Sequence, residues 1–284
     1  NYPTTYMMLN AIVFAPSMLL AIRREQKIIQ SYADKWKIEI AFSDNRYGCF
    51  IRNGRNYFIG HQMDIEAGNM LSNSLVNYIQ RRYLRRFEHV LVPDFRQMPN
   101  LAGTLSKGTI TQEISYLGPL SSYTIPKQTA AKYDWCCILS GVEPQRRFLA
   151  EKLYYILEEN EISAAIITGK EKPYISSGKY VEVFPLLNAE EVQTIVEKSK
   201  FLCIRSGYTS IMDLSVWRKP ALLIPTPGQH EQIYLADYLK NEFGISICRQ
   251  KELSIASFKT SPADVDALPA YDADRLKKEL KKIA

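Results

Sequence analysis

The chain has 284 residues, of which 46% are hydrophobic and 23% are charged. This ordinary globular composition excludes a collagen-like chain, a disordered tail and a small disulfide scaffold, and the length suits one large domain or two smaller ones. The formal net charge of +6 is a mild excess, which disfavours a sequence-independent nucleic-acid binder and suits an anionic ligand or an anionic membrane surface.

Neither the cysteines nor the N-terminal residues indicate export. The five cysteines are odd in number and have no zinc-finger spacing. Residues 7–22 are apolar, but Asn10 and Pro16 interrupt them, and the stretch is shorter than the ~18–20 residues of a membrane span. We therefore expect reduced, buried cysteines in a cytoplasmic protein, and a buried or interfacial helix over residues 7–22.

The first part of the chain alternates short apolar runs with helical stretches. Helices are predicted over residues 18–32 and 69–87, and strands over residues 38–42, 56–59, 90–92 and 115–117. Each predicted strand ends in polar or glycine residues and is followed by a helix, which is typical of a parallel sheet covered by helices. The Pro- and Ser-rich residues 118–132 are the best candidate for a linker.

The same rhythm restarts after this linker. Strands are predicted over residues 135–139, 164–168, 180–184, 201–204, 221–224 and 245–248, and helices over residues 145–157, 189–198, 209–217, 230–241 and 272–283. The sequence thus predicts an α/β protein with two doubly wound, Rossmann-like domains. We expect an N-terminal domain over residues 1–125 and a C-terminal domain over residues 126–284, with a ligand in the cleft between them.

The strongest local motif follows the predicted strand 201–204. Gly207 lets a backbone approach closely, and Thr209 or Ser210 can cap the helix that follows. Amides at a helix N-terminus bind phosphate, and Asp213, about one turn into the helix, can accept two ribose hydroxyls. The alternative is a capped helix without a ligand.

Two further turns carry polar residues at strand ends. Residues 229–232 open a helix and suit hydrogen bonds to sugar hydroxyls, although His230 can be a plain helix-start residue. Ser140 and Gly141 form a third candidate phosphate cradle, but without a GxGxxG fingerprint, so we expect no dinucleotide cofactor. Residues 264–266 and 272–274 are D-x-D patterns; we expect Asp272 and Asp274 to stabilise the last helix, and no metal.

Several segments together resemble a known family. Residues 205–214, 219–225 and 231–236 resemble the C-terminal half of family 28 glycosyltransferases, and residues 60–68 and 116–120 resemble the first domain more loosely. The resemblance covers roughly residues 38 to 245. It implies the GT-B fold, which has two Rossmann-like domains and a nucleotide-sugar donor site mainly in the C-terminal one.

The resemblance also implies roles for individual residues. By position, the diphosphate contacts are Ser140, Gly141, Gly207, Tyr208, Thr209 and Ser210, the base lies against Phe184, Leu186 and Leu187, the ribose contact is Asp213, and the sugar contacts are Glu231 and Gln232. Asp213 is one methylene shorter than the family's glutamate. Glu231 replaces a glutamine, which leaves the identity of the sugar open.

One element of the family pattern is not found. Family members have a glycine-rich loop with a His after their first strand, whereas this chain runs from Asn1 almost directly into a predicted helix. We therefore expect the N-terminal domain to be truncated, with its first strands missing from this chain.

The implied activity is that of an inverting hexosyltransferase using a nucleotide-diphosphate sugar, with UDP as the expected carrier. A base removes the acceptor's hydroxyl proton in a direct displacement while the nucleotide diphosphate leaves. Asp44 is the preferred base and His61 the second candidate. Their alternatives are a loop-capping aspartate and a structural hydrogen-bonding histidine. Rival functions are a nucleotide-sugar hydrolase and a non-catalytic sugar-nucleotide-binding module.

A basic cluster indicates how the acceptor is reached. Arg81, Arg82, Arg85 and Arg86 lie at the end of a predicted helix with aromatic neighbours. They can hold the first domain against anionic lipid and bring a lipid-linked acceptor to the cleft. The alternative is a solvated helix end whose cations suit the helix dipole. We expect a cytoplasmic protein peripheral to the inner face of the membrane, with no nucleic-acid partner.

Overall fold

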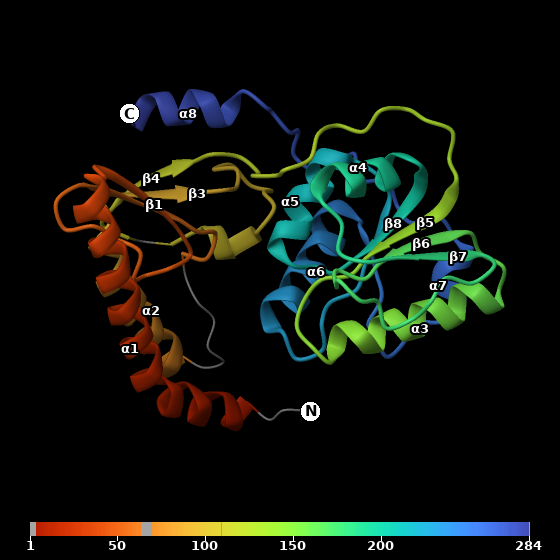
Figure 1. The fold of residues 1–284 in the computed structure, drawn as a ribbon, viewed down its shortest axis with the longest axis horizontal. Coiled ribbons are helices and arrows are strands. Elements are labelled where there is room, and N and C mark those ends of the chain that lie inside the picture. Colours follow the sequence, from red (N-terminus) through yellow and green to blue (C-terminus); the bar gives the residue numbers. More distant parts are fainter. Residues whose placement is uncertain (1–3, 64–69, 109, 284) are drawn as a thin grey trace. The chain divides into compact units, whose positions relative to one another are not determined.

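A computed structural model describes the backbone of residues 4–63, 70–108 and 110–283. By its internal contacts the chain divides into two units (Figure 1). Unit 1 consists of Asn1–Gly118 with Asp272–Ala284, and unit 2 consists of Pro119–Tyr271. Each unit has its own parallel sheet, so the predicted α/β class is confirmed.

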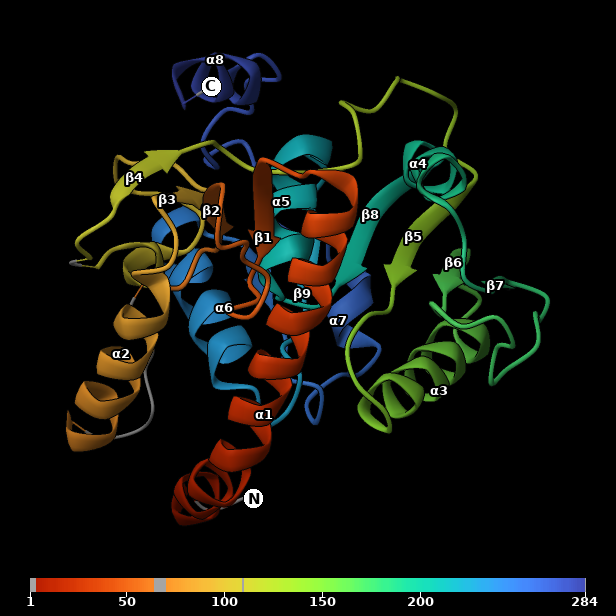
Figure 2. The ribbon, with the colours of Figure 1, turned by 60° about the vertical axis from the view of Figure 1, so that its left-hand side comes forward.

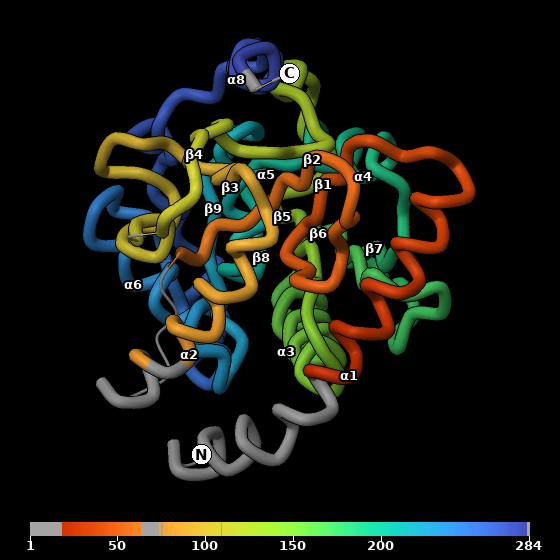
Figure 3. The backbone as a smooth tube through the Cα atoms, turned by 90° about the vertical axis from the view of Figure 1, so that its left-hand side faces the viewer, coloured from red at the N-terminus to blue at the C-terminus, as the bar shows by residue number. Residues whose placement is uncertain are grey.

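Unit 1 is built on four parallel strands that pair in sequence order, β1-β2-β3-β4. Its elements are α1 (Thr4–Trp36), β1 (Ile40–Asp44), β2 (Arg55–Ile59), α2 (Met70–Leu84), β3 (His89–Val92), the 3-10 helix η1 (Gly103–Ser106), β4 (Glu113–Tyr116) and α8 (Arg275–Ile283). Helix α8 lies on the opposite side of the four strands from α2 in all three views (Figures 1 to 3).

The core of unit 1 holds the carboxyl ends of its strands in place. Phe58, Leu84 and Val90 belong to one buried cluster of strand and helix residues. The fully buried Asp94, just after β3, accepts hydrogen bonds from the backbone N–H groups of Phe95, Leu101 and Ala102 at 2.7–3.0 Å. Burial raises the pKa of Asp94, against these hydrogen bonds. Its carboxylate fixes the loop that follows β3.

Unit 2 has six parallel strands in the order β10-β9-β8-β5-β6-β7. Its elements are β5 (Tyr133–Ile138), α3 (Gln145–Glu159), β6 (Ala164–Ile167), β7 (Val181–Phe184), α4 (Ala189–Glu197), β8 (Ser199–Ile204), α5 (Tyr208–Trp217), β9 (Ala221–Leu223), α6 (His230–Phe243), β10 (Ser246–Ile247) and α7 (Ala256–Lys259).

This strand order makes unit 2 doubly wound. The chain runs outward from β5 to β6 and β7, and then returns through α4 to pair β8 with the other side of β5. Helices α3 and α4 lie on opposite faces of the sheet (Figure 1). On the α3 face, Leu149 and Leu153 pack with Trp135 and with Phe258 of α7. The doubly wound fold predicted for the C-terminal part is therefore confirmed.

Some sequence expectations are wrong in detail. No helix follows β1, because Asn45 turns the chain at φ +53° and the buried Asn56 amide holds the loop through Ile51, at 2.8 Å in both directions. The sequence predicts no helix after β6, and there the Glu158 carboxylate accepts the backbone N–H groups of residues 179–181. Helices η1 and α7 lack a clear sequence signal.

The ends of two predicted helices also differ from the structure. Helix α8 begins at Arg275 rather than residue 272, because Asp272 Oδ1 accepts the N–H of Asp274 in a preceding turn. Residues 64–68 of the family-like segment 60–68, and the first residue of the helix predicted over 69–87, lie outside the described residues. No helix in the described ranges is long and apolar enough to cross a bilayer.

Candidate functional site

The candidate site lies at the carboxyl edge of the unit 2 sheet, where the strand order reverses between β5 and β8. Ile138 and Ile204 are paired at the ends of these two strands, which lie side by side in Figure 2. The turns that follow contain Gly141 and Gly207. Open α/β sheets bind ligands outside such a switch point, so the two turns are the expected place for a ligand.

Both glycine turns leave space beside polar groups of the turn after β9 and of the first turn of α6. Gly141 has φ +96°, and a Cβ on it would meet only the Thr226 Oγ1 within 4 Å, at 3.7 Å. A Cβ on Gly207 would meet only Gln232 Nε2, also at 3.7 Å. The absence of a side chain at each glycine therefore leaves space next to the buried Thr226 hydroxyl and the Gln232 amide.

Helix α5 starts at Tyr208 without a side-chain cap. Gly207 is its N-cap residue and, because it has no side chain, it makes no side-chain capping hydrogen bond. The prediction that Thr209 or Ser210 caps the helix is wrong, because both lie inside the first turn, Thr209 exposed and Ser210 half-buried. The positive end of the helix dipole therefore faces the turn without a capping oxygen.

Arg205 precedes this turn and is a buried cation. The sequence predicted no role for it beyond its place in the family-like segment 205–214. It is 1% exposed, and its guanidinium donates to the carbonyls of Ile224 and Pro225, at 3.2 and 3.4 Å, and of Gln145, at 3.1 Å. Its Nε has no partner among the described residues, and burial lowers its pKa to about 10. Arg205 thus ties together the ends of β8 and β9 and the start of α3.

Gln232 at the start of α6 is fixed by its neighbours. Its Oε1 accepts the backbone N–H of Thr226 at 2.9 Å, its Nε2 donates to Gln229 Oε1, and its carbonyl accepts from the Ser206 hydroxyl at 2.7 Å. The Thr226 hydroxyl is buried without a partner in the described part of the chain. Glu231, beside Gln232, is half-buried.

Asp213, on α5, is a half-buried carboxylate. Its Oδ1 accepts a hydrogen bond of 2.7 Å from the hydroxyl of Ser121, in the segment that connects the two sheets. Burial raises the pKa of Asp213 to about 6, and the Ser121 hydrogen bond opposes this rise. Asp213 can therefore change its charge near neutral pH.

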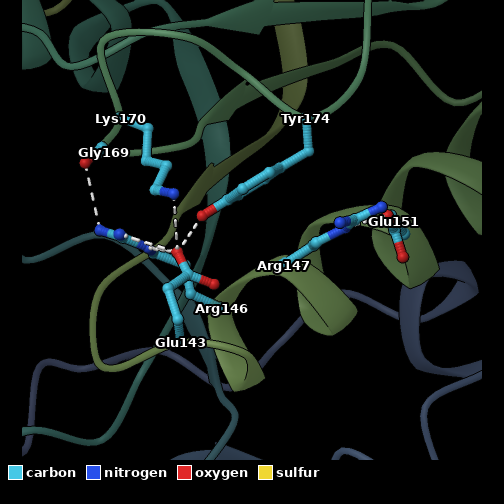
Figure 4. A network of polar contacts seen from close by, with 7 residues as sticks. All are labelled: Glu143, Arg146, Arg147, Glu151, Gly169, Lys170 and Tyr174. Atoms are coloured by element: carbon cyan, nitrogen blue, oxygen red, sulfur yellow. Dashed lines mark hydrogen bonds and ion pairs between the residues drawn. The ribbon is translucent and has the colours of Figure 1, made fainter.

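The loops after β5 and β6 are joined by a polar network (Figure 4). Glu143 Oε1 accepts from Nε and Nη2 of Arg146 at 3.0 and 2.9 Å, lies 3.6 Å from Lys170 Nζ, and accepts from the hydroxyl of Tyr174. Arg146 also donates to the Gly169 carbonyl at 3.1 Å. The network stiffens the loop that holds the exposed Ser140 and Gly141.

The residues predicted to lie against a base follow β7, which β6 separates from β5. Phe184 ends the strand half-buried, Leu186 is exposed and Leu187 is half-buried. The Leu186 N–H donates to the Lys170 carbonyl at 2.7 Å, so this segment is attached to the β6 loop.

In unit 1, Asp44 and His61 lie at one edge of the four-stranded sheet. Asp44 is the exposed last residue of β1 and pairs in register with Ile59, two residues before the half-buried His61. The four predicted arginines, Arg81, Arg82, Arg85 and Arg86, are all exposed at the end of α2. In the part of the chain that the structure describes, no three His, Cys, Asp or Glu side chains are grouped as a metal site.

The arginine cluster continues into a groove that sequence reasoning missed. The groove, of about 490 Å³, is lined by Arg86, by Arg52 and Phe50 from the β1–β2 connection, and by residues of α1, namely Leu20, Ile22, Arg23, Arg24, Gln26 and Lys27. Arg86 lies over the rings of Phe50 and Tyr83 at 5.0 and 4.7 Å. The arginine pair 23–24 is the signal for this groove in the sequence. That the pair lies close to residues 50–52 can be seen only in the structure.

Comparisons with known proteins agree with this architecture. Residues 149–280 match the glycosyltransferase family 28 C-terminal domain. This match supports sugar transfer as the general activity. No curated protein sequence matches the chain.

Solved structures show the fold. The glycotransferase of kitacinnamycin is 11% identical with a TM-score of 0.59, covering 94% of this chain and 77% of that one. A putative UDP-N-acetylglucosamine 2-epimerase from Listeria monocytogenes is 10% identical with a TM-score of 0.58, covering 94% and 79%. S. aureus MnaA, solved with UDP, is 10% identical with a TM-score of 0.54, covering 94% and 80%. The resemblance found in the sequence is therefore confirmed: residues 149–280 are similar to the glycosyltransferase family 28 C-terminal domain, and the chain has the GT-B fold.

Proposed function

We propose that this protein is an inverting glycosyltransferase that moves a hexose from a nucleotide-diphosphate donor to an acceptor. The observation that carries the proposal is the switch point of unit 2, where two glycine turns and the uncapped start of α5 meet above a buried cation. The family match includes β8, α5 and α6, which form most of this edge. Such a site suits a diphosphate, because helix N-termini and buried cations both favour anions.

The donor's leaving group is proposed to bind between the two turns. First-turn N–H groups of α5, from Tyr208, Thr209 and Ser210, bind the diphosphate from one side, and the Ser140–Gly141 turn binds it from the other. Gly207 allows the phosphate to approach the backbone. As the bond to the sugar breaks, negative charge grows on this diphosphate, and the helix dipole and Arg205 stabilise it.

The rest of the donor extends from the diphosphate over neighbouring strand ends. Asp213 accepts the ribose hydroxyls, and Phe184, Leu186 and Leu187 contact the base. Glu231 and Gln232 bind the sugar, Gln232 with its amide already oriented by Thr226. We propose UDP as the carrier, a choice supported by two structures of similar fold, the putative UDP-N-acetylglucosamine 2-epimerase and MnaA solved with UDP.

Unit 1 supplies the acceptor side. Asp44 is the proposed base that removes the proton of the acceptor hydroxyl, with His61 as the second candidate. In this mechanism the oxygen freed of its proton attacks the anomeric carbon as the diphosphate departs, so one displacement inverts the configuration.

The cationic groove of unit 1 supports a lipid-linked acceptor at a membrane surface. Five cations line it, with Leu20 and Phe50 beside them, and none of the five forms an ion pair among the described residues. Leu19 and Leu20 are 40% and 52% exposed on the same helix. Cations without ion pairs next to exposed apolar side chains suit anionic phospholipid, and we propose a peripheral position at the inner face of the membrane.

Nucleotide titration tests the donor site. In isothermal titration with UDP, GDP and TDP, we expect UDP to bind most tightly. Asp213→Ala should weaken UDP binding by about 1–3 kcal/mol, the usual effect of losing hydrogen bonds to a charged group. Unchanged UDP affinity in this variant contradicts the ribose role. Release of UDP from a UDP-sugar without any acceptor identifies the hydrolase rival, and binding without turnover in any assay identifies the non-catalytic rival.

Liposome sedimentation tests the membrane side. Changing Arg81, Arg82, Arg85 and Arg86 to Gln should reduce binding to anionic vesicles, and more salt should reduce the binding of the parent. The matched control changes four exposed lysines of unit 2 to Gln, namely Lys172, Lys198, Lys251 and Lys259. Equal sedimentation of the arginine variant and the control removes the membrane proposal.

A further inference from the structure

Ser121 lies in the connecting segment, which carries no catalytic motif, yet it makes the one side-chain hydrogen bond to Asp213 among the described residues. We propose that Ser121 is a positioning residue for the donor site: it holds Oδ1 of Asp213, so that the ionised carboxylate presents Oδ2 to the two ribose hydroxyls. This inference rests on the proposed function, in which Asp213 binds the ribose.

The direction of the hydrogen bond follows from the partners of Ser121. Its Oγ accepts the backbone N–H of Tyr123 at 3.1 Å and lies 2.7 Å from Asp213 Oδ1. A serine hydroxyl carries a single proton. Because the Tyr123 N–H occupies a lone pair of Oγ, the proton is directed to Asp213, which therefore acts as the acceptor.

The segment that carries Ser121 is held along α5 on both sides of this contact. On one side, the Leu120 N–H donates to the Met212 sulfur at 3.3 Å. On the other, the rings of Tyr123 and Trp217 lie 4.5 Å apart at an angle of 44°. These contacts fix the segment at two points, so the Ser121 hydroxyl keeps its place without a ligand.

The charge of Asp213 gives this hydrogen bond its importance. Burial raises the pKa of Asp213 to about 6, and the Ser121 hydrogen bond opposes this rise. The other titratable group that faces it is the Tyr123 phenol, whose pKa is raised by burial and by Asp213. Without Ser121 the pKa rises further, and a larger fraction of Asp213 is protonated near neutral pH. A protonated carboxyl is a weaker acceptor for the hydroxyls of a ribose.

The proposal predicts selectivity for ribonucleotides. A ribose presents two vicinal hydroxyls, and a 2′-deoxyribose presents one. An ionised, oriented carboxylate gains most from the pair, so Ser121 should strengthen the binding of UDP more than the binding of dUDP.

Titrations of Ser121 variants with UDP and dUDP at pH 6.5, 7.5 and 8.5 test this. Ser121→Ala should weaken UDP binding about fivefold to tenfold at pH 6.5, the size of one typical intramolecular hydrogen bond, and less at pH 8.5. The ratio of the dUDP to the UDP dissociation constant should fall. Taking variant-to-parent ratios at each pH cancels the ligand's own titration. Ser121→Thr keeps the hydroxyl and should bind like the parent.

Thr129→Ala is the matched control, because the Thr129 hydroxyl bonds to the Glu197 carbonyl at 3.0 Å in the same connecting segment, away from Asp213. We expect it to bind UDP like the parent. Tighter UDP binding by Ser121→Ala shows that Ser121 competes with the ligand and overturns the proposal. An equal loss at every pH and for both nucleotides shows a merely structural role and overturns it too. If Asp213→Asn leaves UDP affinity unchanged, the ribose role of Asp213 fails, which is a separate result.

Discussion

Replacing Asp213 by Asn should make the protein more stable at neutral pH. Burial raises the pKa of Asp213 to about 6, whereas an aspartate in an unfolded chain titrates near ~3.9. A difference of about two pH units corresponds to about 3 kcal/mol of unfolding free energy. The buried negative charge is therefore a cost to the fold, and an uncharged amide of the same shape avoids it.

The pH dependence has a definite sign. Between about pH 4 and pH 6 the folded protein binds a proton that the unfolded chain has released, so this group's contribution to stability falls as the pH rises through that range. Above pH 6 the loss is complete. Asp213→Asn should therefore match the parent near pH 4 and exceed its stability by up to about 3 kcal/mol above pH 6. The side-chain amide oxygen of this variant still accepts the hydroxyl proton of Ser121.

Urea unfolding between pH 4.5 and 8 measures this difference. Tryptophan fluorescence reports on unit 2 through Trp135 and Trp217, in a background where the exposed Trp36 of α1 is replaced by Phe. Asp237→Asn is the control, because both carboxylate oxygens of Asp237 accept from Nη2 of Arg249 at 2.8 Å, and this aspartate should not gain stability on losing its charge. If Asp213→Asn is no more stable than the parent at pH 7.5, the argument from burial is refuted.

Three other substitutions probe the same edge of unit 2. Arg205→Met should lower the unfolding free energy by about 2–4 kcal/mol, since two buried carbonyls and one partly buried carbonyl lose this donor. Unchanged urea unfolding contradicts the bracing role. Gly207→Ala should fold like the parent, because the φ angle of Gly207 is −73° and the nearest atom to the new methyl group is 3.7 Å away. Calorimetry should show that this variant binds UDP at least fivefold more weakly, because the methyl group blocks the phosphate. Thr226→Val should change stability by less than about 1 kcal/mol, because its hydroxyl has no partner among the described residues, but weaken UDP binding; equal affinity shows that the hydroxyl does not meet the ligand.

The spacing of apolar residues predicted most of the fold, because in unit 2 the residues of each segment favour the strand or helix that the segment forms. Its buried strands are continuous apolar runs, such as Ala164–Ile167, and their helices have clear starts, such as the Asn188 capping box of α4. The apolar pattern does not predict loops that are held in place by the hydrogen bonds of a side chain. The loop after β1 depends on the Asn56 amide, and the loop after β6 depends on Glu158 near the end of α3, the helix before β6.

The candidate site was predictable at the level of turns and not at the level of contacts. The motif after β8 placed Gly207 and Asp213 on the correct turn and helix. It gave no sign that Arg205 points inward and braces three loops, because its acceptors come from residues 145, 224 and 225. Ser121 was hidden in a linker, 92 residues from Asp213, and such a pairing requires the tertiary structure.

The attachment of Leu120–Tyr123 to α5 decides how the C-terminal half should be isolated. A fragment that begins at residue 126 would have a complete six-stranded sheet and the whole of α5, but it would leave the serine behind. The neighbouring residues 127–132 are all exposed, so a protease would also cut on the wrong side of it. A shortened protein intended for nucleotide-binding studies should therefore start no later than Pro119.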